Sequence, residues 1–461
     1  MSITLVALGV GTVTVPATAQ AAHTPKPALA RIRCVPAKAA GCSATKVNVA
    51  IGKQVQLSGS RLSNGMRVAF RWSKGALAAK LQRTKTGWVV RVPPGTRAGA
   101  VSLTVSDHAG RRSNAKRLTV TAPPPIKAPA PTTQQGTLPA VFAGSGMWIW
   151  QLAKSDGGLL PTIVAKAHQY GISTVYIKSA DGTDSDDWTQ FNPGLVQALH
   201  ANGLHVCGWQ YVYGTNPARE AAAAAVAAQD GADCFVIDAE KQYEGRYAAA
   251  QTYMADLRAA VGPEFPIGLT SFPYVDFHPQ LPYSVFLGPG GAQANLPQVY
   301  WKDIGDSVDA ASAHAYAHNR IYGVPIAALG QTYGGVSAGD VQRFRAIWAG
   351  YGMPSLSWWD WQETPAALWP AISTSVAPVV NPDPGWPSLA KGNKSDEVVW
   401  LQEHLASDYP AVKVTGVFDA ATQSAVQQLQ SAKGLPVSGE TDPATWQAAL
   451  ALPLTPADWT S

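Results

Sequence analysis

Two carboxylates stand two residues apart at the end of an apolar segment near the middle of the chain. Residues 235–240 read Phe-Val-Ile-Asp-Ala-Glu, so the segment ends in Asp238 and Glu240. If the segment is a strand, its side chains alternate between two faces, and both acids lie on one face with backbones about 6.6 Å apart. Two carboxyl groups this close raise the pKa of one of them, which then keeps its proton as a general acid. The spacing therefore suits hydrolysis of a glycosidic bond, which needs a proton donor for the leaving oxygen.

The two acids are expected to have different roles. We expect Glu240 to be the general acid, because it lies further along the strand and has the longer side chain. Asp238 would then tune the pKa of Glu240 or orient a substrate amide. A structural alternative stays open, in which both acids cap the following helix or form ion pairs with Lys178 or Lys302.

Glycoside hydrolysis also requires a second carboxylate as base, nucleophile or stabiliser. Asp360, at the end of the last predicted strand, is our candidate for this role. Asp181 is the alternative, although the sequence Asp181-Gly182 also reads as an ordinary turn. We expect no cofactor and no metal ion in this chemistry, because the zinc motif His-Glu-x-x-His is absent from the sequence.

Polar and aromatic side chains gather at the ends of the other predicted strands. In saccharide sites, aromatic rings stack on sugars while a few polar groups fix the orientation of the ligand. We predict that a substrate is held by Lys178, Asp181, Gln210, Tyr211, Gln298, Tyr300, Gln331, Trp359 and Trp361. Because side chains alternate along a strand, half of the aromatic residues must instead pack outward under helices.

The elements that would position these residues form a repeating pattern in residues 142–376. Eight apolar strand candidates alternate with helical stretches, several of which end at a glycine. This order and length predict a (β/α)8 barrel, whose active site lies at the carboxyl ends of the strands. The strand candidates are residues 147–152, 173–182, 204–214, 234–240, 267–273, 296–303, 325–333 and 354–362.

Two proline-rich linkers, residues 122–141 and 377–387, separate the barrel from a domain on each side. Residues 31–121 alternate short strand patterns with turns, which predicts a small β-sandwich. Residues 388–451 contain a near-repeat in which a glycine turn is followed by an aspartate. In the two copies, Asp419 and Asp442 are expected to be helix N-caps.

The C-terminal segment resembles the peptidoglycan-binding domain 1 family. That resemblance implies a small three-helix bundle that binds cell-wall peptidoglycan, or one that has lost its affinity for this ligand. Most matched residues are turn glycines, caps and core apolar residues, so we do not expect them to contact the ligand. They are Gly392, Ser395, Val398, Leu401, Gln402, Leu405, Gly416, Phe418, Thr422, Ala425, Val426, Gln430, Gly434, Leu435, Gly439, Thr445 and Trp446.

The other two domains carry looser resemblances. The Asp-x-Glu at Asp238 and Glu240 resembles the end of strand four in glycoside hydrolase family 25 lysozymes. Those enzymes also carry an aspartate on strand one, whereas residues 146–151 here read Gly-Met-Trp-Ile-Trp-Gln. Residues 92–120 resemble the end of an immunoglobulin-like IPT/TIG domain. That resemblance implies either a spacer or a module that adheres to an anionic wall polymer.

Charge is distributed unevenly along the chain. Residues 1–141 hold 20 Lys and Arg but a single acid, Asp107, whereas the remainder holds 15 Lys and Arg against 29 acids. The net charges of +19 and −14 add to the overall +5. A basic front suggests an anionic partner, with a merely solubilising surface as the alternative.

The N-terminus predicts export. Residues 1–22 are small and apolar and end in an Ala-Gln-Ala cleavage pattern, which is typical of a signal peptide. No basic n-region precedes them, which leaves the true start open. Export permits disulfides, and Cys34–Cys42 and Cys207–Cys234 are candidate pairs. Export also argues against nucleic acid as a partner, and no later segment is long and apolar enough for a transmembrane helix.

Together these patterns predict a secreted, cell-wall-associated protein of three domains: a β-sandwich, a (β/α)8 barrel and a three-helix bundle. The preferred interpretation is a lysozyme-like glycosidase that acts on peptidoglycan or an associated wall glycan. The alternative is a non-catalytic wall-binding protein with a degenerate, lectin-like barrel. The missing acid on strand one favours the alternative, whereas Asp238 and Glu240 favour the enzyme.

Overall fold

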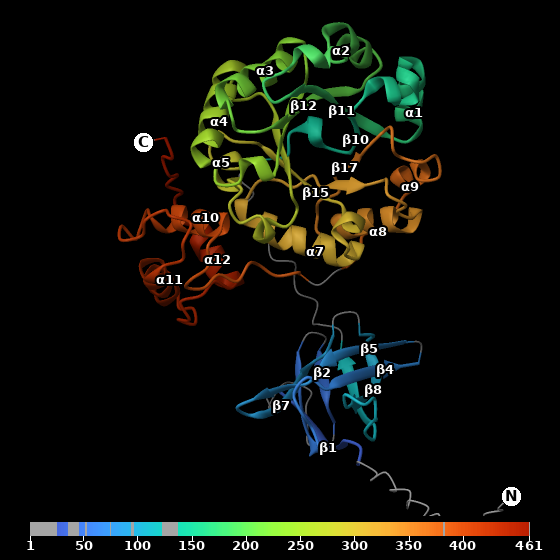
Figure 1. The fold of residues 1–461 in the computed structure, drawn as a ribbon, viewed down its shortest axis with the longest axis vertical. Helices are drawn as coiled ribbons and strands as arrows, with labels where there is room; N and C mark the ends of the chain where they lie inside the picture. Colours follow the sequence, from blue (N-terminus) through green and yellow to red (C-terminus); the bar gives the residue numbers. More distant parts are fainter. Residues whose placement is uncertain are drawn as a thin grey trace, which may run out of the picture. The chain divides into compact units, whose positions relative to one another are not determined.

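The computed structural model describes residues 25–35, 46–50, 53–73, 75–93, 96–121, 137–380 and 383–460. The predicted signal peptide and Cys42 lie outside this range. Contacts divide the chain into two compact units, residues 1–126 and 127–461 (Figure 1). The predicted barrel and the C-terminal helices therefore belong to one unit. Within the described ranges, no helix is long and apolar enough to cross a membrane.

The first unit consists of two mainly antiparallel sheets. One sheet has the order β1 (Ala28–Cys34), β3 (Gln54–Ser60), β7 (Gly87–Arg91) and β6 (Gln82–Thr84). The other has the order β2 (Asn48–Ala50), β9 (Lys116–Thr121), β8 (Gly99–Ser106), β4 (Arg67–Trp72) and β5 (Gly75–Lys80). Alternate side chains of both sheets, such as Leu57, Phe70 and Leu103, share one apolar core. The immunoglobulin-like assignment stays a prediction.

Eight parallel strands close into a barrel in the second unit, as predicted. They are β10 (Ser145–Ile149), β11 (Ile172–Asp181), β12 (His205–Val212), β13 (Cys234–Ala239), β14 (Ile267–Ser271), β15 (Ala294–Val299), β16 (Leu329–Gln331) and β17 (Leu356–Trp359). Several predicted strands were too long. The strand expected at 296–303 ends at Val299, because helix α6 begins at Trp301, and the strand expected at 325–333 is reduced to β16.

Helices surround the barrel (Figure 1). They are α1 (Leu160–Gln169), α2 (Pro193–His200), α3 (Pro217–Gln229), α4 (Tyr247–Val261), α5 (Tyr283–Phe286), α6 (Trp301–Ile304), α7 (Val308–Asn319), α8 (Ala338–Gly350) and α9 (Trp369–Ser373). Short 3₁₀ helices lie in the connections: η1 (Ala140–Phe142), η2 (Leu152–Lys154), η3 (Asp156–Gly158), η4 (Asp186–Trp188), η5 (Lys241–Tyr243), η6 (Val275–Phe277) and η7 (Arg320–Tyr322).

The barrel strands separate two apolar clusters. Trp148, Tyr176, Trp209, Val236 and Leu296 belong to the cluster inside the barrel. Their sequence neighbours belong to the cluster under the helices, among them Met147, Val175, Ile177 and Ile237. Cys207 and Cys234 lie in register on β12 and β13 and form the predicted disulfide inside the barrel.

Three helices form the C-terminal segment: α10 (Asp396–Leu405), α11 (Ala420–Ala432) and α12 (Pro443–Leu450). The predicted caps are confirmed, since Asp419 accepts a hydrogen bond from the Thr422 backbone at 2.8 Å and Asp442 one from the Thr445 backbone at 2.7 Å. Gln402 is fully buried, and its amide joins α10 to the loop before α11 and to Thr422. These hydrogen bonds lie within the C-terminal segment, which agrees with a structural role for the matched residues.

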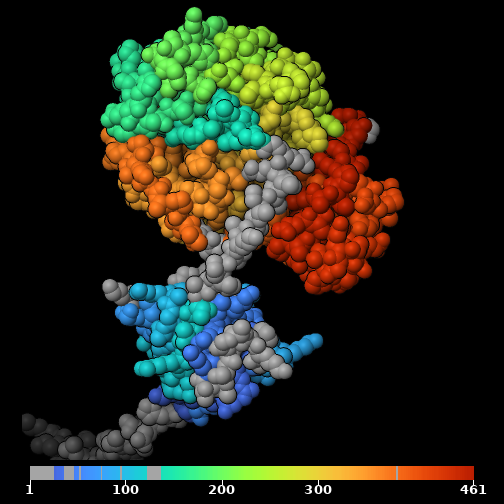
Figure 2. Space-filling model, turned by 180° about the vertical axis from the view of Figure 1, so that it is seen from behind, coloured from blue at the N-terminus to red at the C-terminus, as the bar shows by residue number. Residues whose placement is uncertain are grey.

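Helix α10 docks the C-terminal helices on the barrel, and Figure 2 shows the two parts in contact. The fully buried Asp396 accepts hydrogen bonds from the backbone and hydroxyl of Ser284 at 2.9 and 2.7 Å and from the Tyr322 hydroxyl at 2.7 Å. The Trp400 indole donates to the Ile321 carbonyl at 2.7 Å. Barrel and helices therefore share a hydrogen-bonded, apolar interface.

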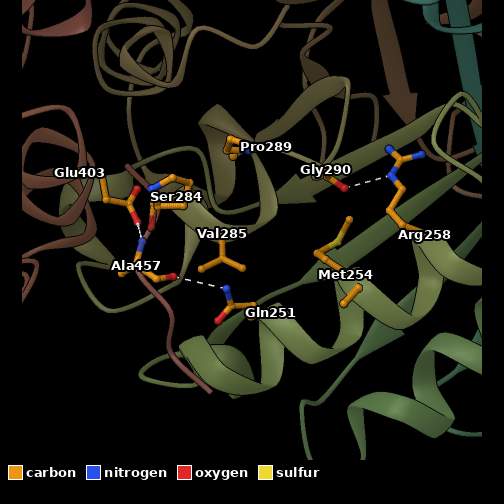
Figure 3. A pocket seen from close by; sticks show the side chains of 12 residues that line it. Gln251, Met254, Arg258, Ser284, Val285, Pro289, Gly290, Glu403 and Ala457 are labelled. Atoms are coloured by element: carbon orange, nitrogen blue, oxygen red, sulfur yellow. Dashed lines mark hydrogen bonds between the residues drawn. The ribbon is translucent and has the colours of Figure 1, made fainter. Parts of the chain in front are cut away.

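A cavity of about 270 Å³ remains at this interface (Figure 3). The C-terminal tail crosses it, because the carbonyl of Ala457 accepts from the Gln251 amide at 3.3 Å and its backbone N–H donates to Glu403 at 2.9 Å. The ring of Trp459 lies on that of Tyr247, with centroids 4.4 Å apart. The tail thus adds a second attachment between α4 and the C-terminal helices.

Substitution of Asp396 is expected to weaken this interface. Asp396→Ala leaves three buried donors without their acceptor, so we expect the free energy of unfolding of the full-length chain to fall by about 2–4 kcal/mol. Urea unfolding followed by tryptophan fluorescence measures the change. Asp408→Ala, at an exposed position of the same segment, is the matched control and should change the value by no more than about 0.5 kcal/mol. Equal effects of the two substitutions would contradict the docking role of Asp396.

Candidate active site

The carboxylate pair lies at the carboxyl end of the barrel. Val236 points into the barrel, whereas Ile237 and Ala239 pack under the helices, so alternation places Asp238 and Glu240 on the inner face. One side chain joins the two acids: the Gln298 amide of β15 donates to Asp238 Oδ1 at 3.0 Å and to Glu240 Oε1 at 3.2 Å. Asp238 is 5% exposed and Gln298 8% exposed. The structure therefore brings the predicted pair together in a nearly dry setting.

Burial sets the protonation of this pair. Burial, followed by the charge of Glu240, raises the pKa of Asp238 well above its usual value, and Lys178 and the Gln298 amide oppose the rise. Burial also raises the pKa of Glu240, against hydrogen bonds from Gln298, Asp238 and Tyr211 and the charge of His278. Burial thus raises the pKa of both acids, with the larger rise at Asp238.

Lys178 is the cation whose charge lowers the pKa of Asp238. Its ammonium group is held by Asp181 at 2.6 Å and lies over the rings of Trp188 and Trp209, 4.4 and 4.8 Å from their centroids. Asp181 also accepts a hydrogen bond from the Tyr213 hydroxyl at 2.8 Å. Asp181 is therefore committed to positioning Lys178, which leaves it a poor candidate for proton transfer.

Aromatic rings line the same end of the barrel. The rings of Trp148, Trp209 and Trp359 contact one another with centroids 5.4–5.8 Å apart. Tyr300 meets Tyr333 edge to face at 5.8 Å, and the negative charges that raise its pKa after burial include Asp238, Glu240 and Asp360. Trp148 and Trp209 are buried, whereas Trp359, Tyr300 and Tyr333 are half-buried and keep ring surface that a ligand can reach.

Three predicted substrate-binding residues do not join this group. Gln210 follows Trp209 and therefore points outward, where it is fully buried and contacts the Glu220 carbonyl of α3 at 2.9 Å. Trp361 also packs under the helices, with its indole donating to Asp156 at 2.9 Å. Gln331 is fully buried and holds the start of α6 through the Lys302 backbone at 3.0 Å. Strand alternation thus turns Gln210 outward and Trp361 packs under the helices, whereas Gln331 shares the inner face with Leu329 and is held by its contact with the start of α6.

Asp360 occupies a different setting from the pair. It is fully buried, its Oδ1 accepts from the Glu363 backbone at 3.0 Å, and its Oδ2 has no hydrogen-bond partner among the described residues. Burial raises its pKa to about 7, since the hydrogen bond from Glu363 only partly offsets the loss of water. Asp360 is thus a carboxyl group that takes up or releases a proton near neutral pH.

Sequence reasoning missed His278. The imidazole stacks on Phe272 with centroids 3.5 Å apart, and its Nδ1 lies 2.9 Å from Glu244 Oε1. From there its charge lowers the pKa of Glu240. His278 comes from the connection after β14, and neither spacing nor a strand pattern relates it to Glu240. Only the fold brings the two together.

The C-terminal segment matches a known family. Residues 394–449 match the family model described as "Putative peptidoglycan binding domain". The C-terminus carries a domain of this family. The resemblance inferred from the sequence is confirmed for this segment, which covers part of the chain only. No curated protein matches the chain.

Several solved structures resemble the fold. A family 39 glycoside hydrolase from Bacteroides cellulosilyticus WH2 is 10% identical, with 74% of this chain and 82% of that chain covered and a TM-score of 0.37. A fungal endo-β-N-acetylglucosaminidase of family 18 is 13% identical, with 49% and 94% covered and a TM-score of 0.37. The autolysin LytC from Streptococcus pneumoniae is 11% identical, with 42% and 46% covered and a TM-score of 0.23. These likenesses concern the fold and do not decide the activity.

Removal of the bridging amide is expected to raise both carboxyl pKa values. Gln298→Leu keeps the approximate size but deletes the hydrogen bonds that favour the charged forms, so the pKa of Asp238 and that of Glu240 should each rise by about one pH unit. Carboxyl ¹³C NMR titration of the folded chain measures them. Gln331→Leu is the matched control, because Gln331 is an equally buried amide that contacts neither acid. If Gln298→Leu left both pKa values in place, the bridge would not control the pair.

Proposed function

We propose that the barrel is a glycoside hydrolase, with Glu240 as its proton donor. The observation that carries this proposal is the Asp238–Glu240 pair, whose carboxyl groups both accept hydrogen bonds from the Gln298 amide and whose pKa values are both raised by burial. A buried carboxyl group of raised pKa is what protonation of a leaving glycosidic oxygen requires near neutral pH. Stacking rings beside the pair suit a sugar ring.

The surroundings support a route for the proton. In this scheme Glu240 carries a proton, which burial favours by raising its pKa, and donates it to the leaving oxygen as the glycosidic bond breaks. Asp238 tunes the pKa of Glu240, while Lys178 and the Gln298 amide oppose the rise in the pKa of Asp238. Lys178 acts as a positioning residue.

Asp360 is our candidate for the second carboxylate of the reaction. Its negative charge, like those of Asp238 and Glu240, raises the pKa of Tyr300. A carboxyl group with a pKa of about 7 and a free buried oxygen can serve as base once it has lost its proton. This assignment rests on the effect that Asp360, Asp238 and Glu240 all have on the pKa of Tyr300.

The proposed substrate is peptidoglycan or an associated wall glycan. The support is the peptidoglycan-binding family of residues 394–449, which is packed on the same unit as the barrel. The lysozyme-like Asp-x-Glu of the barrel is consistent with this substrate class. A wall substrate also fits the proposed export of the chain through residues 1–22, the IPT/TIG-like sandwich and the three-helix bundle at the C-terminus.

Glu240→Gln tests the proton donor. The substitution keeps the shape and removes the transferable proton, so release of reducing ends from purified peptidoglycan should fall about 10²–10⁴-fold. Binding of the full-length chain to insoluble peptidoglycan, measured by co-sedimentation, should remain. Asp238→Asn should reduce the rate less than Glu240→Gln and should move the acidic limb of the pH–rate profile. Asp360→Asn tests the second carboxylate in the same assay.

Glu264→Gln is the matched control, because Glu264 lies in the connection before β14 and is absent from the pair's contacts. If folded Glu240→Gln cleaves as fast as the wild type, the assignment of the donor is wrong. If the wild type binds peptidoglycan but cleaves no wall glycan, the lectin-like alternative replaces the enzyme.

We also propose that the first unit binds an anionic wall polymer. A cationic surface on its second sheet supports this: Arg67 and Arg71 of β4, Lys80 of β5 and Arg117 of β9 are all exposed. Arg67 stands opposite Lys80, and Ser102 stands between Arg71 and Arg117 in register. Like charges opposite one another destabilise a sheet, and a bound polyanion relieves this repulsion.

Binding of this surface should depend on salt. The triple substitution Arg67→Gln, Arg71→Gln and Arg117→Gln should weaken binding of the full-length chain to poly(glycerol phosphate), as measured by biolayer interferometry. Binding of the wild type should be lost at 1 M salt, where the Debye length falls to about 3 Å. The control replaces Arg31 and Arg33 of β1 and Lys53, which precedes β3, by Gln. It removes the same number of positive charges as the first triple substitution. Salt-independent binding, or equal loss in both triples, would contradict a specific cationic surface.

A further inference from the structure

A second group of chemically active side chains lies on the outside of the barrel. Asp276 belongs to η6, and His314 and His318 belong to α7. Each residue offers a ligand atom, and these atoms all lie within 4.8 Å of one another. The two histidines are four residues apart on one helix, so they share a face. This group takes no part in the proposed glycoside hydrolysis.

We propose that Asp276, His314 and His318, together with Glu397 of α10, bind a divalent transition-metal ion of the zinc type. His314 Nε2 lies 2.6 Å from Asp276 Oδ1, and His318 Nδ1 lies 3.9 Å from the same oxygen. Glu397 Oε1 lies 2.6 Å from His318 Nδ1. The three-residue cluster thus comes from η6 and α7, and Glu397 of α10 extends it through its contact with His318.

The donor types select the class of metal. Imidazole and carboxylate together are common zinc ligands, and imidazole also suits copper and nickel. Calcium and magnesium prefer sites made of oxygen atoms alone. Imidazoles bind metal ions in their neutral form, so two carboxylate ligands bring a negative charge that a dication neutralises. The site is thus matched to Zn²⁺ rather than to Ca²⁺ or Mg²⁺.

Aromatic neighbours hold the imidazoles in place. The Tyr274 ring stacks on the His314 ring with centroids 3.9 Å apart. The Phe277 ring meets the His314 ring edge to face, with centroids 5.4 Å apart. The Tyr274 hydroxyl is itself fixed by Asp306 at 2.6 Å. The side chains of Asp276, His314 and His318 are 31%, 27% and 19% exposed, so an ion can reach them from solvent. Ligands that are oriented before binding lose less freedom when the metal arrives.

The proposed site lies where the barrel meets helix α10. Asp276 and both histidines belong to the barrel, whereas Glu397 belongs to the peptidoglycan-binding segment and is 3% exposed. A metal ion at this point would add a bond across the interface that Asp396 already holds. The inferred site would therefore fasten the wall-binding helices to the barrel, whether or not the barrel is an enzyme.

Metal binding by the full-length, untagged chain tests the inference. After treatment with chelator, the wild type should bind about one Zn²⁺ per chain in isothermal titration calorimetry, and bound zinc should raise the melting temperature. The double substitution His314→Ala and His318→Ala should abolish this binding. Glu397→Gln should lower the affinity, because it replaces a charged carboxylate ligand by a neutral amide. Ca²⁺ should produce no comparable heat.

A second histidine pair supplies the matched control. His200 and His205 lie 2.8 and 3.7 Å from a single aspartate, Asp233, away from this site. His200→Ala with His205→Ala should leave zinc binding unchanged. Should the first double variant fail to fold, Asp276→Asn, which keeps the shape, must still weaken zinc binding. Failure of the wild type to bind zinc, or equal loss in both histidine pairs, would show that the cluster consists of ordinary ion pairs and would overturn the inference.

Discussion

Each strand of the closed barrel turns alternate side chains to opposite sides. Closure gives every strand an inner and an outer face, so each residue is committed either to the interior or to the layer under the helices. On β13 this rule sends Val236, Asp238 and Glu240 inward and Ile237 outward. On β12 it sends Trp209 inward and Gln210 toward α3 and α4. The composition of the candidate site follows from this sorting.

Charge is unfavourable in a barrel interior lined by large aromatic rings. The contacts of the carboxylate pair reduce this cost. An isolated buried carboxylate is strongly unfavourable, whereas a pair that shares one proton carries a single charge. One amide, that of Gln298, contacts both acids, and Lys178 supplies a positive charge that is itself balanced by Asp181. The same burial that makes these contacts necessary raises the pKa values on which proton transfer depends.

The sequence was informative where the determinants are local. Each barrel strand is a short apolar run, and the Asp-x-x-Thr patterns at Asp419 and Asp442 specify their caps within four residues. It was uninformative where distant segments meet. Gln298 is 60 positions from Asp238, and the connection that carries His278 has no periodic pattern. Two adjacent residues, Gln210 and Tyr211, were both predicted to bind substrate, although alternation allows only one of them to face the interior.

The acidic start of α10 illustrates how context changes the meaning of a motif. Asp396 and Glu397 directly follow the N-cap Ser395, where acidic residues normally face solvent and favour the helix dipole. Here both are buried, because Ser284, Tyr322 and His318 of the barrel contact them. Burying two acids is favourable only if the barrel provides these donors, so the contacts tie the helices to one place on the barrel. In the proposed function, a wall strand held by the C-terminal segment is therefore presented to the barrel from a defined side, because recognition and chemistry belong to one compact unit.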